Sequence, residues 1–126
     1  MAKETLDQVT TPSLVLDLDV MNANIARMQA KAQALGVTLR PHAKTHKCVE
    51  VAERQRAAGA TGLTVSTLYE AKVFADHGFD DITWAFPVII NRIPDAAKLA
   101  ERITLRLVVD SAEARSEEPV FCLERV

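Results

Sequence analysis

Short apolar segments recur along the chain at regular intervals. Runs of this length bounded by polar or glycine-containing turns are typical of strands. The five predicted strands are residues 14–18, 37–41, 62–66, 82–86 and 103–109. Because successive strands begin about 20 to 25 residues apart, each connection has room for one helix, as a parallel sheet requires.

The first connection has apolar residues at the three- and four-residue intervals of one helix face. They are Ile25, Met28, Ala32 and Leu35. Gly36 follows where a helix C-terminus favours glycine, and Asp19 is expected to cap the helix start.

The third connection opens with a capping box, in which the Thr67 hydroxyl and the Glu70 carboxylate accept hydrogen bonds from otherwise unpaired backbone N–H groups. This helix is expected to end at Gly78. Its predicted buried positions are Leu68, Ala71, Phe74 and Ala75. A further helix is expected from about residues 91–93, because Pro94 suits a first helical turn.

Strand and helix alternation predicts an α/β fold with a parallel sheet in a single domain over residues 1–126. Five strands can form an open doubly wound sheet, whereas a complete (β/α)₈ barrel takes about 250 residues. The predicted divisions are an N-terminal segment with the first strand (1–18), βα repeats (19–110) and an atypical tail (111–126). For the tail we expect a short irregular helix, a cut chain or a shifted reading frame.

Composition excludes several function classes. The 126 residues are 48% hydrophobic and carry 15 basic and 17 acidic side chains. A formal charge of −2 does not favour nucleic acid as a partner. No apolar run reaches the length of a membrane span, and the first residues are too charged for a signal peptide, so a cytoplasmic protein is expected. Cys48 and Cys122 are expected to be thiols.

Residues 40–47, directly after the second predicted strand, carry the densest group of chemically versatile side chains. Its basic members are Arg40, His42, Lys44, His46 and Lys47. Ligand-binding groups of α/β proteins gather at the carboxyl ends of parallel strands. With no acidic residue before Glu50, the segment predicts an unneutralised positive patch suited to a phosphate or carboxylate.

Lys44 is the candidate nucleophile of this segment. A lysine beside other cations loses its proton more easily, and the neutral amine can attack a carbonyl to form a Schiff base. Lys44 has cationic neighbours on both sides and lies closer to the strand than Lys47, which is expected to begin the next helix. The alternative is that both lysines are solvated loop cations.

His42 and His46 are four residues apart, a spacing that lets two histidines on a helix bind one metal ion. Pro41 disfavours a helix here and no acidic third ligand is close, so no metal site is expected. The histidines are expected instead to hydrogen-bond a cofactor ring or phosphate, or to orient Lys44. The four glycines form no G-x-G-x-x-G or Walker motif, which argues against a nucleotide cofactor.

Five groups of residues together resemble one enzyme family. They are 11–19, then Asn24, Ile25, Arg27 and Met28, then 39–47, 65–71 and 78–82, and they are similar to the N-terminal third of the D-serine dehydratase and D-threonine aldolase group. This group belongs to the alanine-racemase-like, fold-type III enzymes that use pyridoxal 5'-phosphate (PLP). The specific part is the P-H-x-K-T-H-K run at residues 41–47.

The resemblance implies a fold and a cofactor site. The first lysine of the run forms the Schiff base with PLP, which maps onto Lys44, and His42 is the expected cofactor-binding neighbour. In the family, the segment corresponding to residues 14–18 joins a C-terminal β-domain. The chain would then supply four strands of a truncated (β/α)₈ barrel, beginning with residues 37–41.

The implied activity is that of a lyase for D-hydroxyamino acids, acting by D-serine dehydration or by D-threonine retro-aldol cleavage. The family's divalent metal, zinc or manganese, is bound near its C-terminus by residues that this sequence lacks. The open alternatives are an amino-acid racemase of the same superfamily and a non-catalytic PLP-binding protein.

An incomplete barrel would expose a sheet edge and apolar inner faces. We therefore expect the isolated chain to fold poorly and to be inactive. Pairing with a second copy, as a homodimer, is one way to cover the exposed surfaces.

Overall fold

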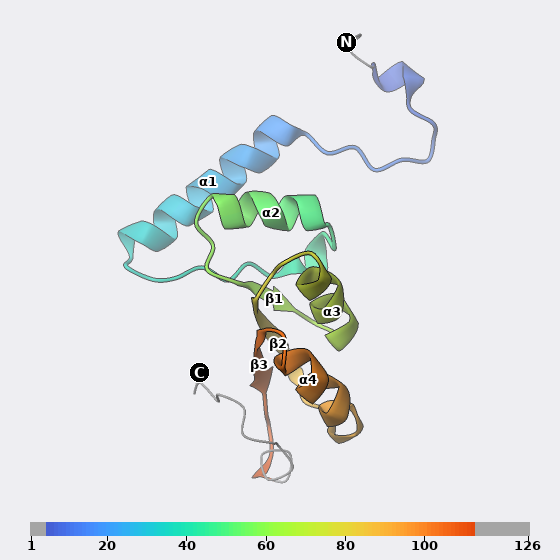
Figure 1. Ribbon diagram of the computed structural model, residues 1–126. Coiled ribbons are helices and arrows are strands. Elements are labelled where there is room, and N and C mark those ends of the chain that lie inside the picture. The colour runs from blue at the N-terminus through green and yellow to red at the C-terminus, as the bar shows by residue number, and fades with distance from the viewer. Residues whose placement is uncertain (1–4, 113–126) are drawn as a thin grey trace.

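Three parallel strands form the centre of the computed structural model, which describes residues 5–112 (Figure 1). They are β1 (Leu63–Val65), β2 (Asp81–Pro87) and β3 (Thr104–Val108), hydrogen-bonded in that order. The last three predicted strands and the α/β class are thus confirmed.

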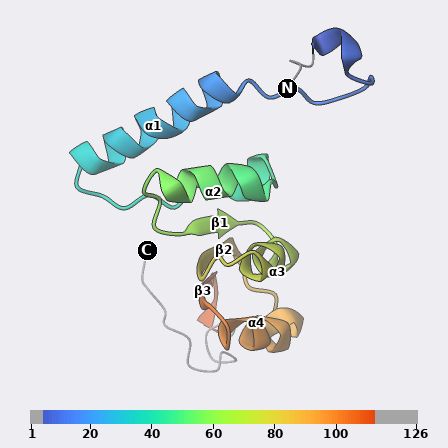
Figure 2. The same cartoon turned by 45° about the horizontal axis from the view of Figure 1, so that its top comes forward.

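Within residues 5–112, four helices connect and flank the strands. They are α1 (Leu18–Ala34), α2 (Val49–Ala57), α3 (Leu68–Asp76) and α4 (Ile93–Ala100). Three short 3₁₀ helices also occur: η1 (Leu6–Gln8), η2 (Ala43–Thr45) and η3 (Ile90–Arg92). Both ribbon views place α3 and α4 on the same side of the sheet (Figures 1 and 2). The parallel βαβ units therefore put these two helices on one sheet face.

The core lies between the sheet and these two helices. Alternate strand residues are buried there, because successive side chains of a strand point to opposite faces. They are Leu63, Val65, Ile82, Trp84, Leu105 and Leu107. The four predicted buried positions of α3 are all buried and belong to this cluster.

Helix ends follow the sequence signals at α3, at the start of α4 and at the end of α1. Thr67 and Glu70 form the predicted capping box of α3, and α4 has its proline in the first turn. Gly36 adopts a φ of 66° just after α1, as expected. The prediction for the start of α1 was wrong: Asp17, not Asp19, accepts the hydrogen bond from the Val20 N–H at 3.0 Å.

The predictions of strands at residues 14–18 and 37–41 were wrong, because neither segment forms a regular strand. Residues 14–17 are extended without a ladder partner among the described residues, and the helix begins at Leu18. Residues 37–41 run beside β1. Leu39 O accepts a hydrogen bond from Thr61 N (3.0 Å), and Pro41 O accepts one from Thr64 N (2.8 Å). Because Pro41 has no N–H to return a bond, the pairing is reduced to one bridge between His42 and Thr64.

The sheet face opposite α3 and α4 carries a row of polar residues where an apolar inner face is expected. Strand register aligns Thr64 with Thr83 and Thr83 with Arg106, and the bridge adds His42 to this row. These residues alternate with the buried ones, so their side chains lie on the other face. No helix of residues 5–112 covers that face.

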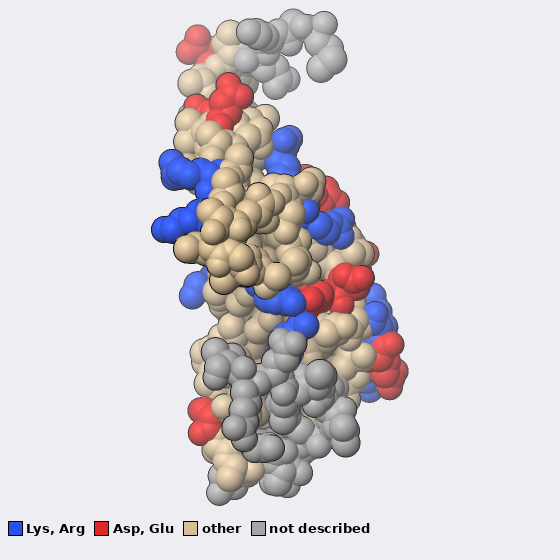
Figure 3. All heavy atoms as spheres, turned by 90° about the vertical axis from the view of Figure 1, so that its left-hand side faces the viewer, with Lys and Arg blue, Asp and Glu red and all other residues tan. Residues whose placement is uncertain are grey.

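Exposed apolar surface is found instead on α1 and the segment before it. The buried residues of α1 are Gln29 and Ala32 alone, whereas Leu14, Met28 and Leu35 are exposed. Viewed from the side of α1, the upper part of the molecule shows a broad area of uncharged side chains bordered by Lys and Arg (Figure 3). Poor folding of the isolated chain stays a prediction.

No helix among residues 5–112 has both the length and the apolar character needed to cross a bilayer. The expected atypical tail falls almost wholly on residues 113–126, which lie outside the described residues.

Candidate functional site

The basic segment lies where the sequence predicts, at the carboxyl end of the sheet. His42 bridges to Thr64, the last but one residue of β1, and η2 follows directly. The chain then passes through Cys48, the N-cap of α2. Residues 43–47 therefore form the loop that connects this end of the sheet to α2.

Arg40 is neutralised by an acid far away in sequence. Its two terminal nitrogens each donate to one carboxylate oxygen of Asp81, at 2.6 Å. Arg106 also contacts this carboxylate. The expectation that Arg40 belongs to an unneutralised patch is therefore wrong, because a paired guanidinium offers fewer donors to an incoming anion.

Lys47 is neutralised as well, by Glu70 of α3. Its ammonium lies 3.3 Å from Glu70 Oε1, while Glu70 Oε2 accepts from Ser66 N (2.8 Å) and Thr67 N (3.2 Å). Burial opposes ionisation of Glu70, but the hydrogen bonds from Ser66, Lys47 and Thr67 outweigh it and lower its pKa. Glu70 is thus a charged, buried anchor beside the loop.

Lys47 does not begin the helix, contrary to expectation. Its φ is 48°, in the left-handed region, and α2 starts two residues later at Val49. A hydrogen bond from Lys47 N to Ala43 O, 2.8 Å long, closes the turn. The turn separates Lys44 from α2 and places the two lysines in different backbone environments.

Lys44 is the lysine of the loop that remains available. It is exposed, and its ammonium makes no ion pair with any residue of the described range 5–112. Its backbone N–H donates to His42 Nδ1 at 3.3 Å, which caps η2. Partial burial and the Lys44 ammonium lower the pKa of His42, whereas Glu70 acts in the opposite direction. The lowered pKa favours the neutral imidazole of His42, directly beside the Lys44 backbone.

His46 turns away from this pair. Its Nδ1 accepts from the Cys48 N–H at 3.1 Å, and its Nε2 is buried without a hydrogen-bond partner. Burial lowers the pKa of His46. Within residues 5–112, no three His, Cys, Asp or Glu side chains come together as metal ligands would.

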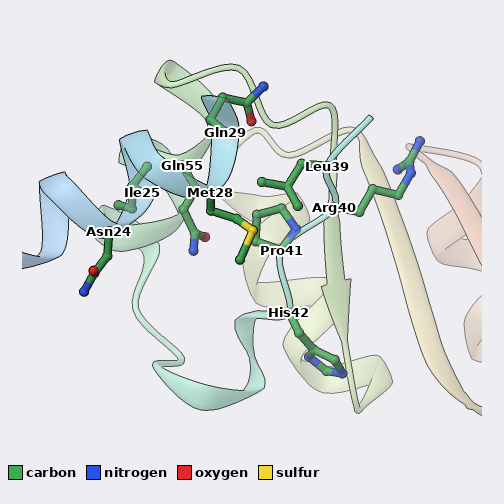
Figure 4. Close-up of a pocket in the computed structure, with 9 residues that line it drawn as sticks. All are labelled: Asn24, Ile25, Met28, Gln29, Leu39, Arg40, Pro41, His42 and Gln55. Carbon is green, nitrogen blue, oxygen red and sulfur yellow. The ribbon is translucent and has the colours of Figure 1, made fainter. Parts of the chain in front are cut away.

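A cavity of about 410 Å³ opens beside the loop, between α1, α2 and residues 39–42. Its apolar wall is formed by Ile25, Met28, Leu39 and Pro41. Figure 4 shows His42 at one end, with its ring turned away from the α1 side chains. Lys44 does not line this cavity, so the cavity and the amine are separate features.

Sequence reasoning missed Asp81 and Glu70, the two acids that neutralise the segment. Each lies more than twenty residues from its cation along the chain, so no local spacing links them. The sequence did indicate a role for Glu70, but only in capping the helix that begins after Thr67.

Sequence comparison connects the chain with known proteins. Residues 16–117 match the family described as "Alanine racemase, N-terminal domain". The D-threo-3-hydroxyaspartate dehydratase of Delftia sp. (strain HT23) is 48% identical over 124 residues, covering 98% of this chain and 33% of that protein. The D-serine dehydratase of Schizosaccharomyces pombe is 35% identical, covering 86% and 28%.

Solved structures give the same result. The Delftia dehydratase superposes with a TM-score of 0.88 and 50% identity, covering 91% of this chain and 31% of that one. The D-threonine aldolase from Filomicrobium marinum gives 0.86 and 36%, covering 89% and 31%. The resemblance identified from the sequence is confirmed, and the chain spans about a third of the length of these relatives.

Proposed function

The chain belongs to the alanine racemase N-terminal domain family, and from this premise we propose that it provides the cofactor-binding lysine of a PLP-dependent lyase for D-hydroxyamino acids. Relatives bear the names D-threo-3-hydroxyaspartate dehydratase, D-serine dehydratase and D-threonine aldolase. All three names describe loss or cleavage at the β-carbon of a D-hydroxyamino acid, which supports a lyase over the racemase alternative.

The observation that carries the proposal is the availability of Lys44. Arg40 and Lys47, on either side of it, are held by carboxylates at 2.6 and 3.3 Å, whereas Lys44 is exposed and has no such partner within residues 5–112. A cofactor aldehyde needs an amine whose nitrogen lone pair is accessible. No carboxylate within residues 5–112 holds the Lys44 nitrogen away from such a ligand.

The neighbouring groups fit one end of the cofactor. PLP, when bound, supplies an electron sink for charge at the substrate's α-carbon. His42 Nδ1 accepts from the Lys44 N–H, so a neutral ring carries its proton on Nε2 and can donate there. Lys44 would hold the aldehyde end and His42 would donate to an oxygen of the ring or phosphate.

Several parts of the site are not assigned to this chain. We assign no metal ligands within residues 5–112, because no three His, Cys, Asp or Glu side chains come together there. Dehydration and retro-aldol cleavage both fit the relatives' names. Because the chain spans about a third of their length, we propose that it turns over little substrate alone.

A spectroscopic titration tests the proposal. Adding PLP to the chain should produce a visible absorption band that Lys44→Ala abolishes and Lys98→Ala, at an exposed helical lysine, retains. Equal bands in both variants would refute the role of Lys44. Formation of keto acid or glycine from D-serine or D-threonine would distinguish a lyase from a non-catalytic PLP-binding protein, and α-proton exchange of D-alanine would indicate a racemase.

A further inference from the structure

Two lysines, Lys44 and Lys47, lie three residues apart on one loop, and their different surroundings raise the question of what makes one of them reactive. Both residues are exposed, and Lys47 has 68% of its side chain accessible. Solvent access therefore does not separate them. The difference lies in the group that each ammonium contacts.

Glu70 is placed to make that difference. Only 8% of the Glu70 surface is exposed. Its carboxylate accepts hydrogen bonds from two backbone N–H groups at the start of α3 and also contacts the Lys47 ammonium. A carboxylate fixed by three partners cannot swing toward solvent. Lys47 is consequently directed to α3.

Schiff-base chemistry turns this geometry into selectivity. The lysine nitrogen adds to the aldehyde carbon, a C=N bond forms and the aldehyde oxygen leaves as water. The nitrogen lone pair must be free for the first step, and an ammonium engaged with a carboxylate does not offer one. Lys44, without such a partner in residues 5–112, is not restrained in this way.

We propose that Glu70 is the positioning residue that selects between the two lysines: by engaging Lys47 it leaves Lys44 as the amine that bonds to a carbonyl ligand. The inference rests on the proposed function, because it presumes an aldehyde cofactor at this loop. Glu70 acts through Lys47 and does not itself touch the reacting atoms.

Reductive trapping measures the selection directly. The full chain is incubated with PLP and borohydride, which reduces the C=N bond, and tandem mass spectrometry quantifies the label at each lysine. In the unchanged chain, label at Lys44 should exceed label at Lys47. In Glu70→Gln, which keeps an acceptor oxygen for the helix cap, the Lys47-to-Lys44 ratio should rise about two- to fivefold, the size expected for a partly exposed ion pair.

A matched control lies on the same helix. Asp76→Asn removes contacts to Lys72 (2.9 Å) and Arg102 (2.7 Å) without touching the loop, so the ratio should stay unchanged. Lys31 and Lys98 are exposed lysines outside the loop and serve as internal references, because a general increase in labelling would raise the label at them as well. A second measurement needs no variant: raising the salt concentration from about 0.05 M to about 0.5 M should increase the Lys47 share by screening the pair.

The outcomes separate the two proposals. A ratio that stays constant in Glu70→Gln and in high salt, with Lys44 labelled throughout, overturns the role of Glu70 and leaves the proposed function standing. Label that rises equally at Lys31, Lys47 and Lys98 in Glu70→Gln also overturns it, because Glu70 would then act through stability alone. Absence of label at Lys44 in the unchanged chain refutes the proposed function and the inference with it.

Discussion

Arg40 and Asp81 form a two-pronged ion pair, with both guanidinium nitrogens 2.6 Å from the two carboxylate oxygens. The guanidinium crosses Gly62 to reach its partner: a Cβ at Gly62 would lie 2.3 Å from Arg40 Nη1. The pair thus joins residues 37–41 to β2 across β1. It replaces, with side chains, part of the ladder that Pro41 interrupts.

Asp81→Asn should destabilise the fold by about 1–2 kcal/mol, between the values for exposed and buried pairs, because Arg40 and Arg106 lose their shared carboxylate. Urea unfolding followed by the fluorescence of Trp84, which is buried at 3% exposure, measures the change. Asp80→Asn is the matched control, since the side chain of Asp80 is exposed one residue away. Equal effects of the two substitutions would contradict a structural role for the pair.

Acidification should weaken the fold through its histidines before Glu70 and Asp76 are protonated. Burial lowers the pKa values of His42 and His46 below 6.5 in the folded chain, so the unfolded chain takes up protons first as the pH falls. The urea midpoint should therefore drop between about pH 7.5 and about pH 5.5. The lowered pKa values of Glu70 and Asp76 keep their stabilisation intact above about pH 4.5, outside this window.

The double variant His42→Gln/His46→Gln provides the control for this pH dependence, because it should show a smaller drop over the same range. A midpoint that rises or stays level on acidification of the unchanged chain would show that these histidines are not the groups concerned.

In limited proteolysis, α1 should be cleaved earlier in time than the strands of the sheet. This helix buries Gln29 and Ala32, whereas β1, β2 and β3 contribute most of the core, so local opening of α1 costs less. Trypsin is expected to cleave after Arg27 and Lys31 of α1 earlier than after Arg106 of β3, read by mass spectrometry of timed samples. Simultaneous cleavage at all three positions would mean that α1 is protected as well as the core.

Local signals in the sequence predicted local structure well. The capping box at Thr67 and Glu70, the proline of α4 and the alternation of β2 are each settled by residues within one turn or strand. Residues 14–18 have an apolar pattern of the same kind, yet they form no strand here. A strand needs a partner, and pattern alone does not show whether one is within reach.

The site illustrates the same limit. Position at the carboxyl end of a strand and the P-H-x-K-T-H-K run were enough to select Lys44 and His42. The charge state of the segment was not predictable, because Asp81 and Glu70 reach Arg40 and Lys47 through the tertiary fold. Because those two acids pair with Arg40 and Lys47, the predicted broad positive patch is reduced to Lys44, which has no ion pair within residues 5–112.

Identification of the residue that bonds to PLP tests the account most directly. After incubation with PLP and reduction by borohydride, peptide mass spectrometry should find the added cofactor mass on Lys44, and Lys44→Arg should lose it while keeping the far-ultraviolet circular dichroism of the unchanged chain. Cofactor mass on a different residue, or on none, would contradict the assignment of Lys44.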